Sequence, residues 1–264
     1  MRFDTKFQQA LALQKTFLCV GIDPDPQLLP ARFSHDAEGV YRFVQEVLEA
    51  TAPVAAAFKF NLAFFEIWGW QGWQILYRLI TEVPQGLLTI GDAKRGDIGN
   101  SARFYARALF ETLGFDAATV SPYLGSDSIQ PFITNEDHGA FVLCVTSNPS
   151  GAEIQHFGDL EPLYLNVARR MNQLNVHHNL GLVMGATKPE QLAMVRSLFP
   201  DLPFLIPGIG KQGGEVTQAL TVCRSNGRGL INVSRAVLFP DGDSSPAGIA
   251  TAARQYAQRF KTGE

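Results

Sequence analysis

Short apolar runs of β-prone residues alternate along the chain with longer stretches in which apolar positions recur every three or four residues. In residues 41–52, for example, Phe43, Val44, Val47 and Leu48 fall on one face of a helix. The short runs predict strands at residues 16–21, 54–60, 87–90, 117–120, 140–145, 180–184, 204–206 and 230–233. The longer stretches predict helices at residues 41–52, 73–82, 101–113, 163–174, 189–198, 215–223 and 247–260.

This alternation predicts parallel strands joined by helical crossovers, which is the pattern of an α/β fold. Nearly continuous apolar strands fit a sheet whose outer face is covered by helices. Eight such units in 264 residues favour a single (β/α)8 TIM barrel that uses the whole chain, residues 1–264. A doubly wound sheet is the alternative, but no Gly-x-Gly-x-x-Gly follows the first strand, which disfavours dinucleotide binding.

The composition of the chain excludes some classes of binding partner. The formal net charge of −3 gives no overall attraction to nucleic acid or to an acidic membrane surface. Three widely spaced cysteines disfavour a disulfide framework and a zinc site. The N-terminus lacks the apolar core of a signal peptide, and no apolar run approaches the roughly 20 residues of a membrane span. We therefore expect a cytoplasmic protein that binds neither nucleic acid nor membrane.

Polar and glycine-rich positions gather just after the ends of the predicted strands. In a barrel such positions converge on the C-terminal face, which is where active sites lie. This convergence points to an active site more strongly than any single residue does. The positions include Asp23, Lys59, Asn61, Asp92, Ser147, Asn148, Gly208, Gly210 and Arg235.

The densest group of charges follows the third predicted strand. Asp92 and Lys94 are two positions apart, so an extended backbone there would aim both side chains to one side. Asp97 follows on a turn after Gly96, and Lys59 ends the neighbouring strand. A surface salt-bridge cluster is the plainer interpretation. The preceding apolar strand, the second charged strand end and the flanking glycines favour a functional site instead.

The same segment carries a family resemblance. The run DAKRGDI at residues 92–98 resembles the Asp-x-Lys-x-x-Asp-Ile signature of the orotidine 5′-monophosphate decarboxylase family. Four more segments resemble motifs of this family in the family's order: FKFN at 58–61, TSNPSG at 146–151, PGIGKQGG at 207–214 and NVSR at 232–235. The similarity runs from Asp23 to Arg235, and the last two loops resemble the longer bacterial branch of the family.

The resemblance implies a carbon–carbon lyase that converts orotidine 5′-monophosphate to UMP and CO2, the last step of de novo UMP biosynthesis. It implies no cofactor and no metal. Lys94 would stabilise negative charge on C6 of the pyrimidine and then donate a proton there. Asp92 and Asp97 would keep Lys94 charged, and Lys59 would balance the array. The residue that matches Asp97 reaches into the partner's site, so the resemblance also implies a homodimer with shared active sites.

The resemblance also implies a set of residues that bind the substrate: Asp23, Asn61, Ser147, Asn148, Gly208, Gly210, Gln212 and Arg235. Asp23 would hold ribose hydroxyls, Asn61 would support the array, and Ser147 would bond the pyrimidine amide edge. Gly208, Gly210, Gln212 and Arg235 would hold the phosphate, at the usual phosphate site of a barrel. Several of these residues also have a purely structural interpretation when each is taken alone. Asp23 before a proline is typical of a turn, Ser147 is typical of a helix cap, and the two glycines are typical of a turn without a ligand.

Two other functions fit parts of the pattern. Related barrels such as 3-hexulose-6-phosphate synthase share the Asp-x-Lys-x-x-Asp motif but use Mg²⁺ to stabilise an enediolate. The loop with Gln212 and the segment Ser147-Asn148-Pro149 favour the decarboxylase. The other alternative is a non-catalytic binder of nucleotides or phosphosugars, and the presence of all four charged residues argues against it.

Overall fold

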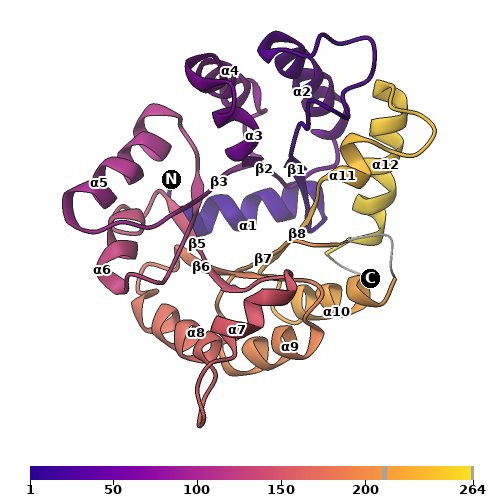
Figure 1. Cartoon of the computed structure of the whole chain (residues 1–264). Helices are drawn as coiled ribbons and strands as arrows, with labels where there is room; N and C mark the ends of the chain where they lie inside the picture. Colours follow the sequence, from indigo (N-terminus) through magenta and orange to yellow (C-terminus); the bar gives the residue numbers. More distant parts are fainter. Residues whose placement is uncertain (210–212, 263–264) are drawn as a thin grey trace.

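Strands and helices alternate and close into a barrel in the computed structural model, which describes residues 1–209 and 213–262 (Figure 1). Eight strands in these ranges run parallel and pair in chain order, and the last pairs with the first to close the ring. The fold is therefore the predicted (β/α)8 barrel. The strands are β1 (Leu18–Ile22), β2 (Ala57–Asn61), β3 (Leu88–Arg95), β4 (Ala117–Val120), β5 (Gly139–Val145), β6 (Leu180–Met184), β7 (Phe204–Ile206) and β8 (Gly229–Val233).

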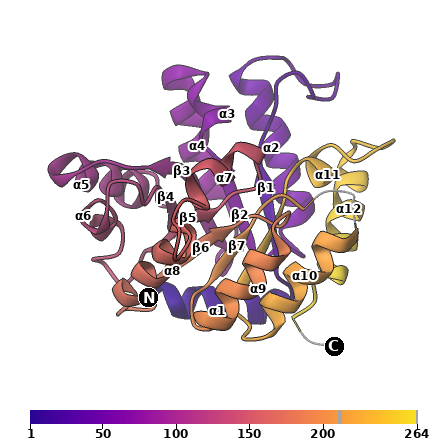
Figure 2. The same ribbon diagram turned by 60° about the horizontal axis from the view of Figure 1, so that its bottom comes forward.

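Helices surround the barrel, and Figure 2 shows three of them, α8 to α10, following one another along its outside. The longer helices are α2 (Ala37–Thr51), α4 (Gly69–Glu82), α5 (Gly99–Arg107), α8 (Leu163–Leu174), α9 (Pro189–Leu198), α10 (Gly213–Arg224) and α12 (Pro246–Arg259). Short helical segments are α3 (Ala63–Glu66), η1 (Ala108–Thr112), α6 (Ser126–Ile129), η2 (Gln130–Phe132), η3 (Pro149–Gly151), α7 (Ala152–Gln155) and α11 (Arg235–Leu238). No helix in the described ranges is long and apolar enough to cross a membrane.

The third strand departs from the sequence prediction. It was expected to end at Ile90, but β3 continues to Arg95, so Asp92 and Lys94 lie within the strand. Its pairing with β4 is irregular between Gly91 and Arg95, and Lys94 has a left-handed backbone with φ of 48°. The expectation of an ordinary extended backbone is therefore wrong at Lys94, whereas Asp92 stays in the strand and pairs with Asn61 of β2. The deviation matters because it occurs at the most highly charged part of the chain.

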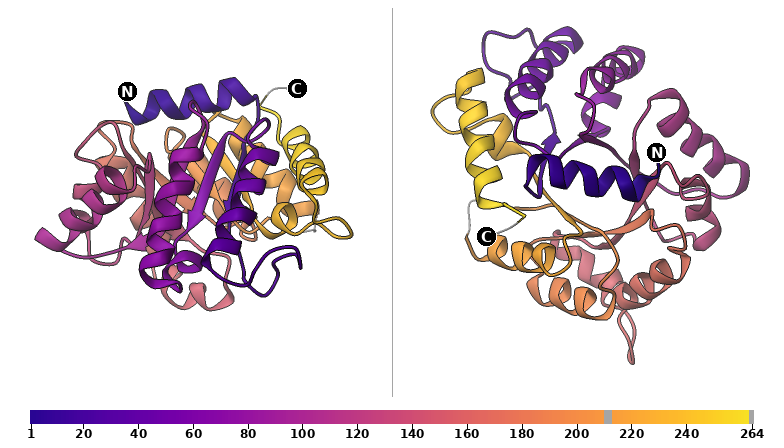
Figure 3. Two further views of the ribbon diagram at one scale, coloured as in Figure 1. Left: turned by 90° about the horizontal axis from the view of Figure 1, so that it is seen from above. Right: turned by 180° about the vertical axis from the view of Figure 1, so that it is seen from behind.

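A helix that the sequence analysis did not predict, α1 (Phe3–Gln14), lies across one end of the barrel (Figure 3). Its buried residues Phe3, Phe7, Ala10 and Leu11 recur at helical spacing and form one apolar face. Phe3 packs edge-on against Phe141 of β5, with ring centroids 6.2 Å apart. The helix therefore covers the N-terminal end of the barrel and leaves the opposite end for the polar residues.

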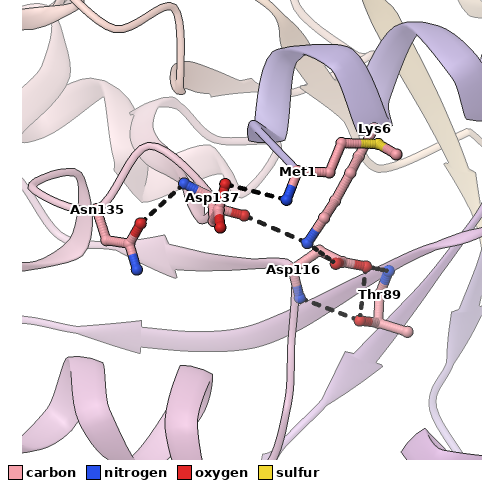
Figure 4. Close-up of polar contacts among 6 residues, drawn as sticks. All are labelled: Met1, Lys6, Thr89, Asp116, Asn135 and Asp137. Carbon is pink, nitrogen blue, oxygen red and sulfur yellow. Dashed lines mark hydrogen bonds and ion pairs between the residues drawn. The ribbon is translucent and has the colours of Figure 1, made fainter.

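Ionic contacts hold α1 against the strand ends (Figure 4). The Lys6 ammonium lies 3.0 Å from Oδ1 of Asp116, which precedes β4. The other oxygen of Asp116 accepts the backbone N–H of Thr89 at 2.9 Å and its hydroxyl at 3.1 Å. A more exposed pair joins the Met1 amino group to Asp137 at 3.2 Å. Asp116 thus links α1 to β3 through three donors.

We expect Asp116→Ala to lower the free energy of unfolding by about 3 kcal/mol, because it leaves Thr89 and Lys6 without their charged acceptor. Asp137→Ala is the matched control, and its half-exposed ion pair should contribute less than about 1 kcal/mol. Urea denaturation of the two variants checks this. Equal losses in both would show that Asp116 has no special part in holding the cap.

Candidate active site

The C-terminal ends of the strands surround a cavity of about 460 Å³. Each of the eight strands, or the residue directly after it, contributes to its lining. Nine residues singled out from the sequence line this cavity together: Asp23, Lys59, Asn61, Asp92, Lys94, Ser147, Asn148, Gly208 and Arg235. The expected convergence on one face of the barrel is confirmed for these positions.

Asp92 is the centre of the charged array. Its Oδ2 accepts the Lys59 ammonium at 2.6 Å, and its Oδ1 accepts the Lys94 ammonium at 2.6 Å. Lys59 is only 4% exposed and Asp92 10% exposed, whereas Lys94 is 50% exposed. The carboxylate therefore holds one lysine inside the barrel and a second at the cavity mouth, where the latter can meet a ligand.

The opposite charges of the array keep its buried members ionised. Burial opposes the charged form of Asp92, but the ammonium groups of Lys59 and Lys94 outweigh it and hold the pKa of Asp92 below its ordinary value. Burial also opposes the charged form of Lys59, yet the carboxylates of Asp92 and Asp23 raise the pKa of Lys59 above its ordinary value. Asp92 and Lys59 are thus both ionised at neutral pH.

Asp23 follows β1 on the same side of the cavity. Its Oδ1 is buried and has no hydrogen-bond partner within the described part of the chain. A buried carboxylate oxygen without a donor costs free energy, so this atom is suited to accept a hydrogen bond from a ligand hydroxyl.

Another part of the lining is apolar. Leu143, Val183 and Leu205 come from β5, β6 and β7, and Ile209 follows β7. Val183, Leu205 and Ile209 are buried, and Leu143 is partly buried. A ligand seated here would have charged groups at one edge and hydrocarbon at another, and the hydrocarbon would exclude water from that edge.

The loop after β7 and the start of α11 border the cavity together. Gly208 has φ of +90°, a conformation that favours glycine, and a Cβ there would lie 3.4 Å from Cβ of Ser147. Arg235 is exposed and is the first residue of α11. A glycine turn beside an arginine is suited to an anionic group, because the guanidinium can contact it in a bidentate manner.

Three expected residues stand apart from this set. Gly210 and Gln212 lie outside the described residues. Asp97 accepts the backbone N–H of Ile98 at 2.8 Å, and no ion pair joins it to Lys94 in this chain. Across residues 1–209 and 213–262, no three His, Cys, Asp or Glu side chains form a candidate metal site.

Comparison with known proteins agrees with this geometry. Residues 16–246 match the family model of the orotidine 5′-phosphate decarboxylase / HUMPS family. The chain is 43% identical over 261 residues to the orotidine 5′-phosphate decarboxylase of Herpetosiphon aurantiacus, with 98% of this chain and 96% of the relative covered. This chain belongs to the orotidine 5′-phosphate decarboxylase / HUMPS family.

Solved structures extend the likeness to three dimensions. The OMP decarboxylase of Leishmania donovani superposes with a TM-score of 0.84 at 36% identity and full coverage of both chains. A Toxoplasma gondii structure described as a putative orotidine-monophosphate decarboxylase gives a TM-score of 0.88 at 33% identity, with 97% and 96% of the two chains covered. The family resemblance inferred from the motifs is therefore confirmed.

Two further polar residues line the cavity, and neither was given a role from the sequence. Thr119 on β4 donates to Asp92 Oδ1 at 2.9 Å and accepts the backbone N–H of Lys94 at 2.9 Å. Asn232 on β8 donates to Ser234 at 3.2 Å. A single polar side chain inside a short apolar strand was the available signal, and each of these strands has one.

We expect Asp92→Asn to lower the free energy of unfolding by about 3–5 kcal/mol, because Lys59 would remain buried without the carboxylate that contacts it. Asp97→Asn is the matched control, since no ion pair of Asp97 with Lys94 is lost, and it should change stability by less than about 0.5 kcal/mol. Guanidinium denaturation measures both. A stability of Asp92→Asn equal to that of Asp97→Asn would contradict a buried ion pair at this position.

The pH dependence of this difference follows from the two pKa shifts. Because the pKa of Asp92 is lowered in the folded protein, its contribution to the free energy of unfolding is complete above the ordinary carboxyl pKa. This contribution is lost only as pH falls through the folded-state pKa. Because the pKa of Lys59 is raised in the folded protein, its contribution to the free energy of unfolding is complete below the ordinary lysine pKa. This contribution is lost only as pH rises through the folded-state pKa. The contribution of the pair to the stability of the wild type should therefore stay constant from about pH 5 to pH 9. In Asp92→Asn, burial of Lys59 without Asp92 favours loss of its proton at high pH, so the difference between the two proteins should shrink as pH rises toward about 9.

Proposed function

We propose that this protein decarboxylates orotidine 5′-monophosphate to UMP and CO2, the last step of de novo UMP biosynthesis. The observation that carries the proposal is the array of Lys59, Asp92 and Lys94, whose outer ammonium faces a cavity with an apolar wall. The names of the relatives support the substrate. The family's other chemistry, on phosphosugars, needs a metal and gives a contrasting test.

The chemistry follows from where charge develops. When the bond from C6 to the substrate carboxylate breaks, the electron pair stays on C6 and CO2 leaves. The ammonium of Lys94 stabilises this carbanion and then transfers a proton to C6, which completes UMP. Asp92 keeps the ammonium in place, and Lys59 neutralises the second oxygen of Asp92. The apolar residues Leu143, Val183 and Leu205 limit access of water to the departing CO2.

The rest of the substrate is held away from the reacting carbon. Asp23 accepts ribose hydroxyls through its unpaired oxygen, and Asn61 supports the array. Ser147, beside Asn148, bonds the amide edge of the pyrimidine. Gly208, Gly210, Gln212 and Arg235 hold the phosphate. Binding energy from the phosphate and the ribose fixes C6 against Lys94, although neither group reacts.

The protein also acts as a homodimer with shared active sites in this proposal. Asp97 makes no ion pair with Lys94 of its own chain, so its carboxylate is available to complete the array of a second copy. Apolar side chains next to it are exposed, including Ile98, Phe104 and Tyr105 on or beside α5 and Tyr123 after β4. A second copy that covers these residues would bring Asp97 to its site.

The chain forms one catalytic domain over residues 1–264 and works in the cytoplasm. The family match over residues 16–246 contains all eight strands of the closed barrel, which supports a single domain. Cys19, Cys144 and Cys223 are buried free thiols, which suits a reducing compartment.

We expect purified, EDTA-treated protein to consume orotidine 5′-monophosphate, followed as a loss of absorbance, and Lys94→Ala to lower the rate at least about 10³-fold because the proton donor is lost. Lys94→Ala should still bind UMP in calorimetry. Lys261→Ala, which removes an exposed lysine at the other end of the barrel, is the control and should match wild type.

Other outcomes separate the alternatives. No turnover by folded wild type would contradict the decarboxylase, and UMP binding without turnover would indicate a non-catalytic binder. Activity that appears only with Mg²⁺ and a phosphosugar would indicate the metal-dependent chemistry. Near-normal turnover by Lys94→Ala would remove this residue from its assigned role.

Mixing variants tests the shared site. Lys94→Ala and Asp97→Ala should each be nearly inactive, whereas an equal mixture after subunit exchange should recover about one quarter of wild-type activity. Half of the dimers are then mixed, and each of these has one site with both native residues. No recovery despite exchange, shown by native mass spectrometry of differently labelled copies, would place Asp97 in its own chain's site. An Asp97→Ala variant that is active by itself would place Asp97 outside the mechanism.

A further inference from the structure

Thr119 lies opposite the one irregularity in the pairing of β3 with β4. Gly91 pairs with Ala118 and Arg95 pairs with Val120, so three residues of β3 stand opposite the single residue Thr119. Those three residues include Asp92 and Lys94. The irregular segment of β3 therefore carries the outer half of the charged array, and Thr119 is the residue of β4 that faces it.

The hydroxyl of Thr119 bridges the two ends of this segment. The backbone N–H of Lys94 donates to Oγ1 at 2.9 Å, and Oγ1 lies 2.9 Å from Oδ1 of Asp92. An amide N–H can only donate, so the hydroxyl accepts there and its own hydrogen points to Asp92. The same Oδ1 accepts the ammonium of Lys94 at 2.6 Å. Lys94 is thus held at its backbone by Thr119 and at its ammonium by Asp92.

The backbone of Lys94 needs such support. Its φ of 48° is a left-handed conformation that costs a residue with a side chain free energy unless neighbouring groups impose it. Thr119 is 1% exposed, so water cannot readily replace its hydroxyl. Without the two hydrogen bonds, the segment would be free to relax toward an ordinary strand, and the side chain of Lys94 would leave its present direction.

We propose that Thr119 is a positioning residue, whose hydroxyl fixes the left-handed turn of the strand and the Asp92 carboxylate so that the Lys94 ammonium is presented to the cavity. The inference rests on the proposed function, because its kinetic consequence concerns proton donation by Lys94. Its structural consequence does not depend on the substrate.

The barrel provides a matched control at its other end. Thr89 at the start of β3 is also buried, and its hydroxyl likewise bridges a carboxylate and a backbone N–H (Figure 4). It donates to Oδ2 of Asp116 at 3.1 Å and accepts the N–H of Asp116 at 3.1 Å. Thr89→Val therefore removes an equivalent pair of hydrogen bonds without touching the array.

The test compares Thr119→Val, Thr119→Ser and Thr89→Val in the full chain. Thr119→Val keeps the shape of the side chain and should lower kcat roughly tenfold to a hundredfold with KM for orotidine 5′-monophosphate little changed, because a small misplacement of a reacting group costs about this much. Thr119→Ser retains the hydroxyl and should recover most of the loss. Thr89→Val should lose stability in urea denaturation but keep the kcat of wild type.

Crystal structures of the same variants give a readout without substrate. Lys94 should leave the left-handed conformation in Thr119→Val and keep it in Thr119→Ser and Thr89→Val. An unchanged Lys94 backbone in Thr119→Val would overturn the proposal even if wild type proved inactive on orotidine 5′-monophosphate. With an active wild type, it would also be overturned by a normal kcat in Thr119→Val, by a loss confined to KM, or by a serine variant as slow as the valine variant.

Discussion

The structure of this site depends on the ion pair between Lys59 and Asp92. A buried ammonium is tolerated only beside a carboxylate at close range, and a buried carboxylate needs donors for both of its oxygens. Lys59 takes one oxygen at 2.6 Å, which leaves the other for Lys94 and Thr119. The direction of the outer ammonium is therefore a consequence of satisfying a charge inside the barrel.

The barrel accommodates the charged array because its two ends are built differently. At the N-terminal end, α1 covers the strands, and Asp116 ties it to β3. The C-terminal end is left open, and each strand brings residues to one cavity. Charges from β1, β2 and β3 then face apolar side chains from β5, β6 and β7 across a space that is large enough for a small ligand. Stability and ligand contact are thus separated along the axis of the barrel.

Much of this could be read from the sequence, because strand periodicity and motif order are local properties. The predicted bounds of β4, β6 and β7 agree with the structure, and nine predicted residues meet in the cavity. Helix α1 was not predicted, although Phe3, Phe7 and Leu11 have the spacing of one helix face. The left-handed turn at Lys94 is set by pairing with Thr119. A polar residue in an apolar strand marks Thr119 as unusual, but it does not say which residue of β3 it contacts.

The central claim is that the array presents the ammonium of Lys94 to the reacting carbon of a pyrimidine nucleotide. A crystal structure with bound UMP tests it most directly. The claim predicts Nζ of Lys94 within roughly 3–3.5 Å of C6, with Asp92 still holding the ammonium and the phosphate beside Arg235. A complex in which C6 faces the apolar wall, or in which Lys94 contacts the phosphate instead, would contradict the account.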